Sequence, residues 1–126
     1  MVRIGDKVFV TGGYDFAEWL MGGEGYTGEA VGFLSEGNVQ KKGLVLDLGN
    51  EVTIGKVTGR YLILSLRYVG ATWEDEGIVH VVIAASIPDD TGWTWDFQTE
   101  PDPEQGFEWV EAAASYKVIR DGSSPN

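Results

Sequence analysis

Proton-transfer chemistry has one natural candidate in this sequence, His80, the only histidine in the chain. A histidine can act as a general base near neutral pH, and with Ser65 or Ser86 as nucleophile and a carboxylate to orient the ring it could serve a hydrolase. No G-x-S-x-G elbow supports this arrangement, and a lone histidine in a strand of Val and Ile is more often a hydrogen-bonded structural residue. We therefore favour binding over catalysis. The alternative is a small hydrolase or lyase that uses His80 or a pair of carboxylates in a barrel pocket.

Acidic side chains gather in the second half of the chain. Residues 1–70 hold 7 Lys/Arg against 8 Asp/Glu, whereas residues 71–126 hold 2 against 12, so most of the net charge of −11 lies there. Neither the acidic turn Glu74-Asp75-Glu76 nor the acids between residues 89 and 104 match a calcium-binding loop. The glycine-rich residues 22–25 match no phosphate-binding loop. We expect a solvated acidic face, with no metal and no cofactor.

Cysteine is absent, which excludes disulfides and thiolate metal sites. No stretch approaches the roughly 20 apolar residues that span a bilayer, and the first residues form no signal-peptide-like apolar run. We expect a soluble, cytoplasmic protein with no membrane partner.

The aromatic residues are the other candidates for function, because five Trp, five Tyr and five Phe in 126 residues cannot all lie in a central core. They either plug the ends of the fold or form a recognition surface that anchors a partner. With the acidic turn and the histidine, the candidate ligand- or partner-binding residues are Tyr14, Phe16, Trp19, Trp73, Glu74, Asp75, Glu76, His80, Trp93 and Trp95.

The elements that must position these residues are short strands. Glycine accounts for 18 of 126 residues and disfavours helix interiors. Period-two alternation predicts strands, with glycines in the second strand marking a bulge or a barrel corner. The predicted strands cover residues 6–11, 26–34, 44–48 (ending at Gly49-Asn50), 61–68, 78–83 and 107–119, the last being one bent strand or two. A helical turn or ordered loop is expected over 14–21, and a long loop over 88–106.

These elements predict an all-β fold: a small antiparallel, SH3-like curved barrel or sandwich with long loops and at most one short helix. We expect a single domain over residues 1–120 and a flexible tail over 121–126.

The segments Ile4-Gly5-Asp6-Lys7-Val8-Phe9-Val10 and Gly25-Tyr26-Thr27-Gly28-Glu29-Ala30-Val31 resemble the opening strands of small SH3-like barrels such as KOW and CAP-Gly modules. Residues 44–48 and 59–61 are similar to the next CAP-Gly strands, so the resemblance covers about half of the chain. It implies the fold but transfers no functional residue. The GKNDG loop with which CAP-Gly modules recognise acidic tails is absent, and a net charge of −11 opposes the RNA partners usual for KOW modules.

The leading hypothesis is a small interaction module that binds an unknown protein or small ligand through loop aromatics and an acidic surface, with no nucleic acid expected. Two variants stay open. The acidic face could imitate nucleic acid and block a basic protein, or exposed strand edges could make the chain a self-associating structural protein or homo-oligomer.

Overall fold

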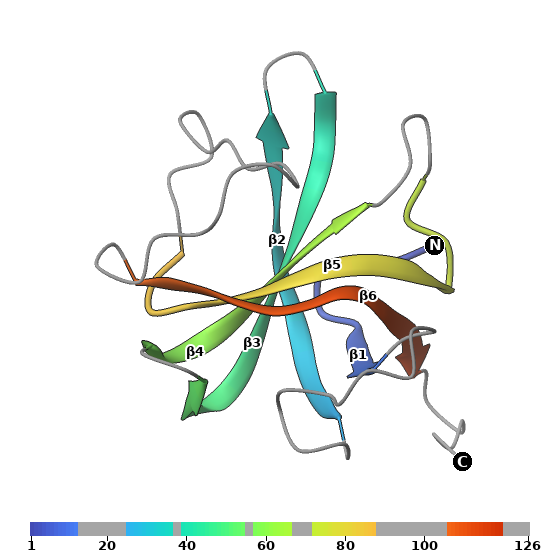
Figure 1. Ribbon diagram of the computed structural model, residues 1–126. Helices are drawn as coiled ribbons and strands as arrows, with labels where there is room; N and C mark the ends of the chain where they lie inside the picture. The colour runs from blue at the N-terminus through green and yellow to red at the C-terminus, as the bar shows by residue number, and fades with distance from the viewer. Residues whose placement is uncertain (13–24, 37–38, 55–56, 67–71, 88–105, 120–126) are drawn as a thin grey trace.

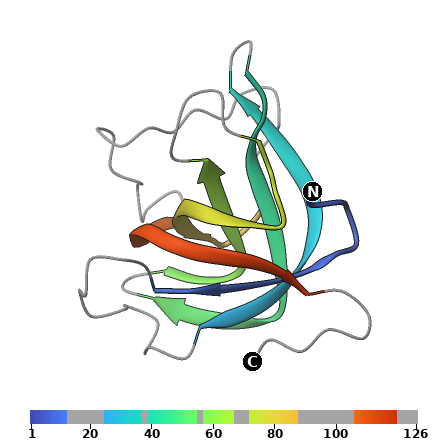
Figure 2. The same ribbon diagram turned by 90° about the vertical axis from the view of Figure 1, so that its right-hand side faces the viewer.

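The computed structural model shows a closed barrel of six antiparallel strands (Figure 1). Each strand pairs with its neighbours in the sequence, and β1 pairs with β6 to close the ring (Figure 2). The strands are β1 (Lys7–Thr11), β2 (Tyr26–Glu36), β3 (Val39–Ile54), β4 (Val57–Leu66), β5 (Glu76–Ala84) and β6 (Phe107–Ile119). The prediction of a small antiparallel all-β fold is confirmed, and the fold is a barrel.

The structure describes residues 1–12, 25–36, 39–54, 57–66, 72–87 and 106–119. Within these ranges there is no helix, and accordingly none that could cross a membrane. The helical turn expected over 14–21 and almost all of the long loop expected over 88–106 lie outside them, as does the predicted tail.

Alternating aliphatic side chains fill the interior of the barrel. In β4, Leu62 and Leu64 point inward and lie opposite Leu46 and Leu44 of β3. Burying a side chain of this size contributes about 1.5–3 kcal/mol each, so the period-two pattern accounts for both the strands and their closure around one core. The fully buried interior side chains include Val8, Val10, Leu44, Leu46, Leu62, Leu64, Val79, Val81 and Ile83.

The outer face of the central strands is also apolar. Val45, Ile63 and Val82 lie side by side across β3, β4 and β5, and each is at most 3% exposed. They form a second buried cluster with Leu34 and Ala84. Strand β4 is therefore buried on both faces along its second half.

Bulges bend the long strands around the core. The register of β2 against β3 shifts between Ala30 and Gly32, which confirms the irregularity predicted from the glycines of this strand. The expectation that β3 ends at Gly49-Asn50 is wrong. Strand β3 continues to Ile54 through a bulge, in which Gly49 takes a φ of 81° and donates its N–H to Asp47 Oδ1 at 2.8 Å. The predicted final segment forms one strand, β6, with two register shifts against β5.

An ion pair braces the bulge in β3. Arg60 donates to both carboxylate oxygens of Asp47, at 2.6 and 3.0 Å, and these hydrogen bonds lower the pKa of Asp47. Gly59, beside Arg60, lies so close to β5 that a Cβ atom there would overlap the carbonyl oxygen of Ala84. Only glycine fits at this crossing.

Candidate binding site beside Trp73

A pocket of about 170 Å³ lies next to Trp73, where the segment before β5 meets β2, β3 and the end of β4. Three of its walls, Val2, Leu66 and Trp73, are buried, whereas Met1 and Lys41 are exposed, so the pocket opens to solvent on their side. We call it the Trp73 pocket. Its lining residues are Met1, Val2, Phe33, Lys41, Leu66, Thr72 and Trp73.

Trp73 forms a fixed wall of this pocket. Its indole Nε1 donates to the carbonyl oxygen of Lys41 at 2.6 Å, and its own carbonyl oxygen accepts the N–H of Val2 at 3.0 Å. The ring also makes tilted aromatic contacts with Phe33 and Tyr116, with centroids 6.4 and 5.5 Å apart, a separation at which aromatic pairs attract. With only 4% of its surface exposed, Trp73 presents a pocket wall to a partner and not a protruding anchor.

Lys41 is held in an unusual backbone conformation at the mouth of the pocket. Its φ of 54° is the only positive value at a non-glycine residue in the described part of the chain. The cause is the register between β2 and β3, in which Leu34 faces Gly43 but Glu36 faces Val39, so extra residues of β3 bulge outward here. A left-handed conformation costs about 1–2 kcal/mol for a residue with a Cβ atom, and such strain gathers at ligand sites.

The ammonium group of Lys41 lies over an aromatic ring. Its Nζ is 5.1 Å from the centroid of Phe33, within the range of a cation–π contact. Among the described residues no carboxylate forms an ion pair with it. The pocket therefore combines an apolar, aromatic interior with the ammonium group of Lys41 at its mouth.

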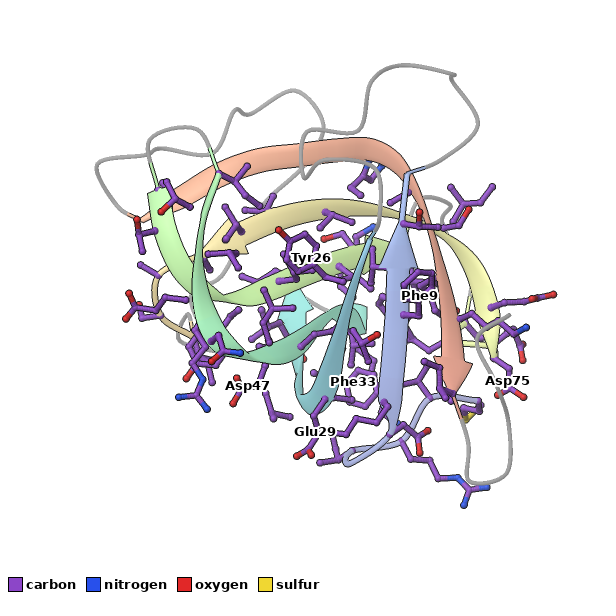
Figure 3. The ribbon with its side chains drawn as sticks, turned by 90° about the horizontal axis from the view of Figure 1, so that it is seen from below. Phe9, Tyr26, Glu29, Phe33, Asp47 and Asp75 are labelled. Carbon is purple, nitrogen blue, oxygen red and sulfur yellow. The ribbon has the colours of Figure 1, made fainter. Side chains whose placement is uncertain are left out.

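The acidic turn Glu74-Asp75-Glu76 directly follows the pocket wall, and all three residues are exposed. Glu74 accepts a hydrogen bond from Thr72 Oγ1 at 2.7 Å, and the Asp75 carboxylate contacts the N-terminal ammonium group of Met1. Glu76 lies opposite Lys117 on β6. In Figure 3, Asp75 and Asp47 lie at opposite edges of the barrel, with Phe33 between them.

The negative charge of this turn affects the pKa of Tyr116, which packs against Trp73. The Tyr116 hydroxyl donates to the carbonyl oxygen of Glu74 at 3.0 Å. Burial, followed by the charges of Glu74 and Asp75, raises the pKa of Tyr116 to about 12. Tyr116 is thus a neutral hydrogen-bond donor that ties β6 to the acidic turn.

His80 occupies a different part of the molecule. On β5 it faces outward, directly opposite Ser65 of β4, and the two residues are 3% and 2% exposed. Ser65 Oγ has no hydrogen-bond partner among the described residues. The structure thus juxtaposes the histidine with one of its two candidate nucleophiles, but neither side chain lines the Trp73 pocket or reaches solvent. A hydrolase built on His80 stays a prediction.

The remaining candidates, Tyr14, Phe16, Trp19, Trp93 and Trp95, lie outside the described residues. Within the described ranges no group of three or more His, Asp or Glu residues could hold a metal ion. The chain matches no protein-family model, no curated protein and no solved structure. Its function must therefore be inferred from the geometry of the barrel.

Only Trp73 of the seven pocket residues is a candidate from the sequence; the other six are Met1, Val2, Phe33, Lys41, Leu66 and Thr72. No local sequence pattern marks them. The pocket depends on the register shift between β2 and β3 and on the long-range hydrogen bond that joins Trp73 to Lys41. The clearest signal was Trp73 itself, an aromatic residue beside a charged turn.

Proposed function

We propose that this chain is a binding module whose contact surface is the Trp73 pocket together with the acidic turn beside it. The observation that carries the proposal is a pocket of about 170 Å³ with two aromatic walls and the ammonium group of Lys41 at its mouth. Ligand sites are typically concave and mostly apolar, with a few polar groups that fix orientation. A dry cavity of about 150 Å³ already holds a benzene ring, so the pocket has room for a ligand of that size.

The walls of the pocket are organised before any ligand arrives. Trp73 is held by a hydrogen bond at the ring, another at its backbone and two aromatic contacts. A site that is already ordered loses less conformational entropy on binding. This rigidity supports recognition of a ligand of defined shape.

The acidic turn supports a protein as a second kind of partner. Three exposed carboxylates in succession attract a basic surface and accelerate its approach at low ionic strength. Glu76→Gln removes one charge from the acidic turn and should slow the association of poly-lysine with the protein. Glu51→Gln should slow it less, because Glu51 is also exposed but lies on β3, outside the turn. Equal rates for the two variants would count against a docking role of the turn.

Other features of the molecule stay predictions: the likeness to SH3-like modules, a cytoplasmic location, imitation of nucleic acid, and self-association. The binding proposal requires none of them.

The pocket can be tested with three single-ring probes of different charge, benzoate, benzyl alcohol and benzylamine, added to the isotope-labelled full chain. We expect NMR shift changes centred on the Trp73 indole and on the methyl groups of Val2 and Leu66. Val2→Phe, which fills the pocket, should abolish them, whereas Ile4→Phe, at a residue that is 57% exposed and does not line the pocket, should not. If no probe perturbs these groups, or if Val2→Phe binds as the unaltered protein does, the proposal is wrong.

A further inference from the structure

We propose that the Trp73 pocket takes a small organic anion, with an apolar ring-sized body inside the pocket and a single carboxylate paired with the ammonium group of Lys41. This inference rests on the proposed function, since it names the class of ligand for the same pocket. It follows from the size of the pocket, from the chemistry of its walls and from the charge at its mouth.

The body of the ligand is set by the walls. Phe33 and Trp73 supply aromatic surface, and Val2 and Leu66 supply aliphatic surface. The indole N–H, a polar group of these walls, is already engaged by the carbonyl oxygen of Lys41. The interior therefore offers van der Waals contact and favours a ring or a short branched chain over a polar body.

The charge of the ligand is set by Lys41. This lysine is exposed and its ammonium group rests on the Phe33 ring, without a carboxylate partner among the described residues. A carboxylate at the mouth could accept a charge-assisted hydrogen bond from it, the strongest polar contact that such a pocket can offer.

Two acids of the turn beside the pocket are engaged by other groups. Glu74 accepts a hydrogen bond from Thr72, and the Asp75 carboxylate contacts the N-terminal ammonium group. The net charge of −11 opposes an anion from a distance, but exposed charges farther than about 8 Å are largely screened at physiological ionic strength. The charge of Lys41, which is in direct contact with the ligand, therefore makes the pocket prefer an anion. A cationic ligand would be repelled by the like charge of this lysine.

The three ring probes distinguish this inference from the broader proposal. Measured by calorimetry and by NMR on the full chain at one pH and salt concentration, benzoate should bind about tenfold more tightly than benzyl alcohol, since a hydrogen bond to a charged group is worth about that factor. Benzylamine should bind most weakly. If all three bind equally, or if benzylamine binds best, the carboxylate assignment is wrong while the pocket stands; if none binds, the proposed function fails as well.

Variants of Lys41 isolate the charge. Lys41→Gln should remove the preference of the pocket for benzoate over benzyl alcohol, and Lys41→Arg should keep this preference. Lys117→Gln removes the same charge from an exposed residue of β6 outside the pocket and should change neither affinity. A preference for benzoate that survives in Lys41→Gln, or that disappears equally in Lys117→Gln, would overturn the inference. The Arg variant and the probe series on the unaltered chain keep it testable even if Lys41→Gln fails to fold.

Discussion

Trp73 donates its indole hydrogen to the main-chain carbonyl oxygen of Lys41, 32 residues earlier in the chain, at a distance of 2.6 Å. This single bond joins the segment before β5 to the bulge in β3. It holds the aromatic wall of the pocket against the residue that carries the pocket's cation. The position of the Trp73 ring in the pocket therefore depends on the backbone conformation of Lys41.

Replacing Trp73 by Phe should lower the free energy of unfolding by about 2–3 kcal/mol, because it removes a buried hydrogen bond and leaves a void beside the smaller ring. Urea denaturation of the full chain measures this change. A matched control is Phe9→Leu on β1, which shortens a half-buried aromatic side chain that does not line the pocket and should cost less. An unchanged midpoint for Trp73→Phe would show that the bond to Lys41 is not a structural tie.

The left-handed backbone at Lys41 predicts an inverted order of stability for two variants that both lose the ammonium group. Lys41→Gly should be more stable than Lys41→Ala by about 1 kcal/mol, because only the alanine retains a Cβ atom in this conformation. In ordinary extended strand the order is the reverse, since glycine weakens strands. Thermal melts of the two variants decide the matter, and a more stable alanine variant would argue against a positive φ at this position.

Tyr116 predicts a loss of stability at alkaline pH. Its pKa is raised from 10.0 to about 12 in the folded protein, so the unfolded chain releases this proton more readily. The contribution of Tyr116 to stability is therefore complete below pH 10 and declines as the pH rises toward 12. Denaturation measured across that window should show the decline, which Tyr116→Phe should reduce.

The cause of this shift can be checked separately. The difference in tyrosinate absorbance between the unaltered protein and Tyr116→Phe reports the ionisation of Tyr116 alone. Because burial and then the charge of Glu74 raise its pKa, Glu74→Gln should lower that pKa while Glu51→Gln leaves it unchanged. A midpoint at the ordinary value of 10.0 in the unaltered protein would contradict the packing of Tyr116 behind Trp73.

The crossing of β4 and β5 at Gly59 predicts a large effect from one methyl group. Gly59→Ala should destabilise the barrel by about 2–3 kcal/mol or more, because its Cβ atom would overlap the carbonyl oxygen of Ala84 and force the strands apart. Gly32→Ala is the control, since a Cβ atom there meets nothing within 4 Å. Equal stability of the two variants, measured by urea denaturation, would mean that the strands do not approach so closely at Gly59.

The regular parts of this fold could be predicted from sequence, because they obey local rules. The alternation of Leu62, Leu64 and Leu66 placed them on one face, and the interior of the barrel is where they lie. The glycines of the second strand indicated the irregularity found at Gly32. These signals need only neighbouring residues, since the alternation of a strand and the freedom of glycine are local properties.

The irregular parts could not be predicted in the same way. The bulge that carries Lys41 exists only because the pairing of β2 with β3 shifts in register, and Gly49 continues β3 where the strand was expected to end. Phe33 and Trp73 are 40 residues apart and meet only after the barrel closes. Because bulges and contacts between distant segments bring the pocket residues together, these residues share no regular spacing in the sequence. The sequence therefore indicates Trp73 but not the other residues of the pocket.

The most direct test of the central claim is a crystal structure of the full chain with para-bromobenzoate, located by the anomalous scattering of bromine. We expect a bromine peak in the Trp73 pocket, against the walls that Phe33 and Trp73 form, with the carboxylate directed at Lys41. Bromine bound only elsewhere, with the pocket filled by the protein's own side chains, would contradict it.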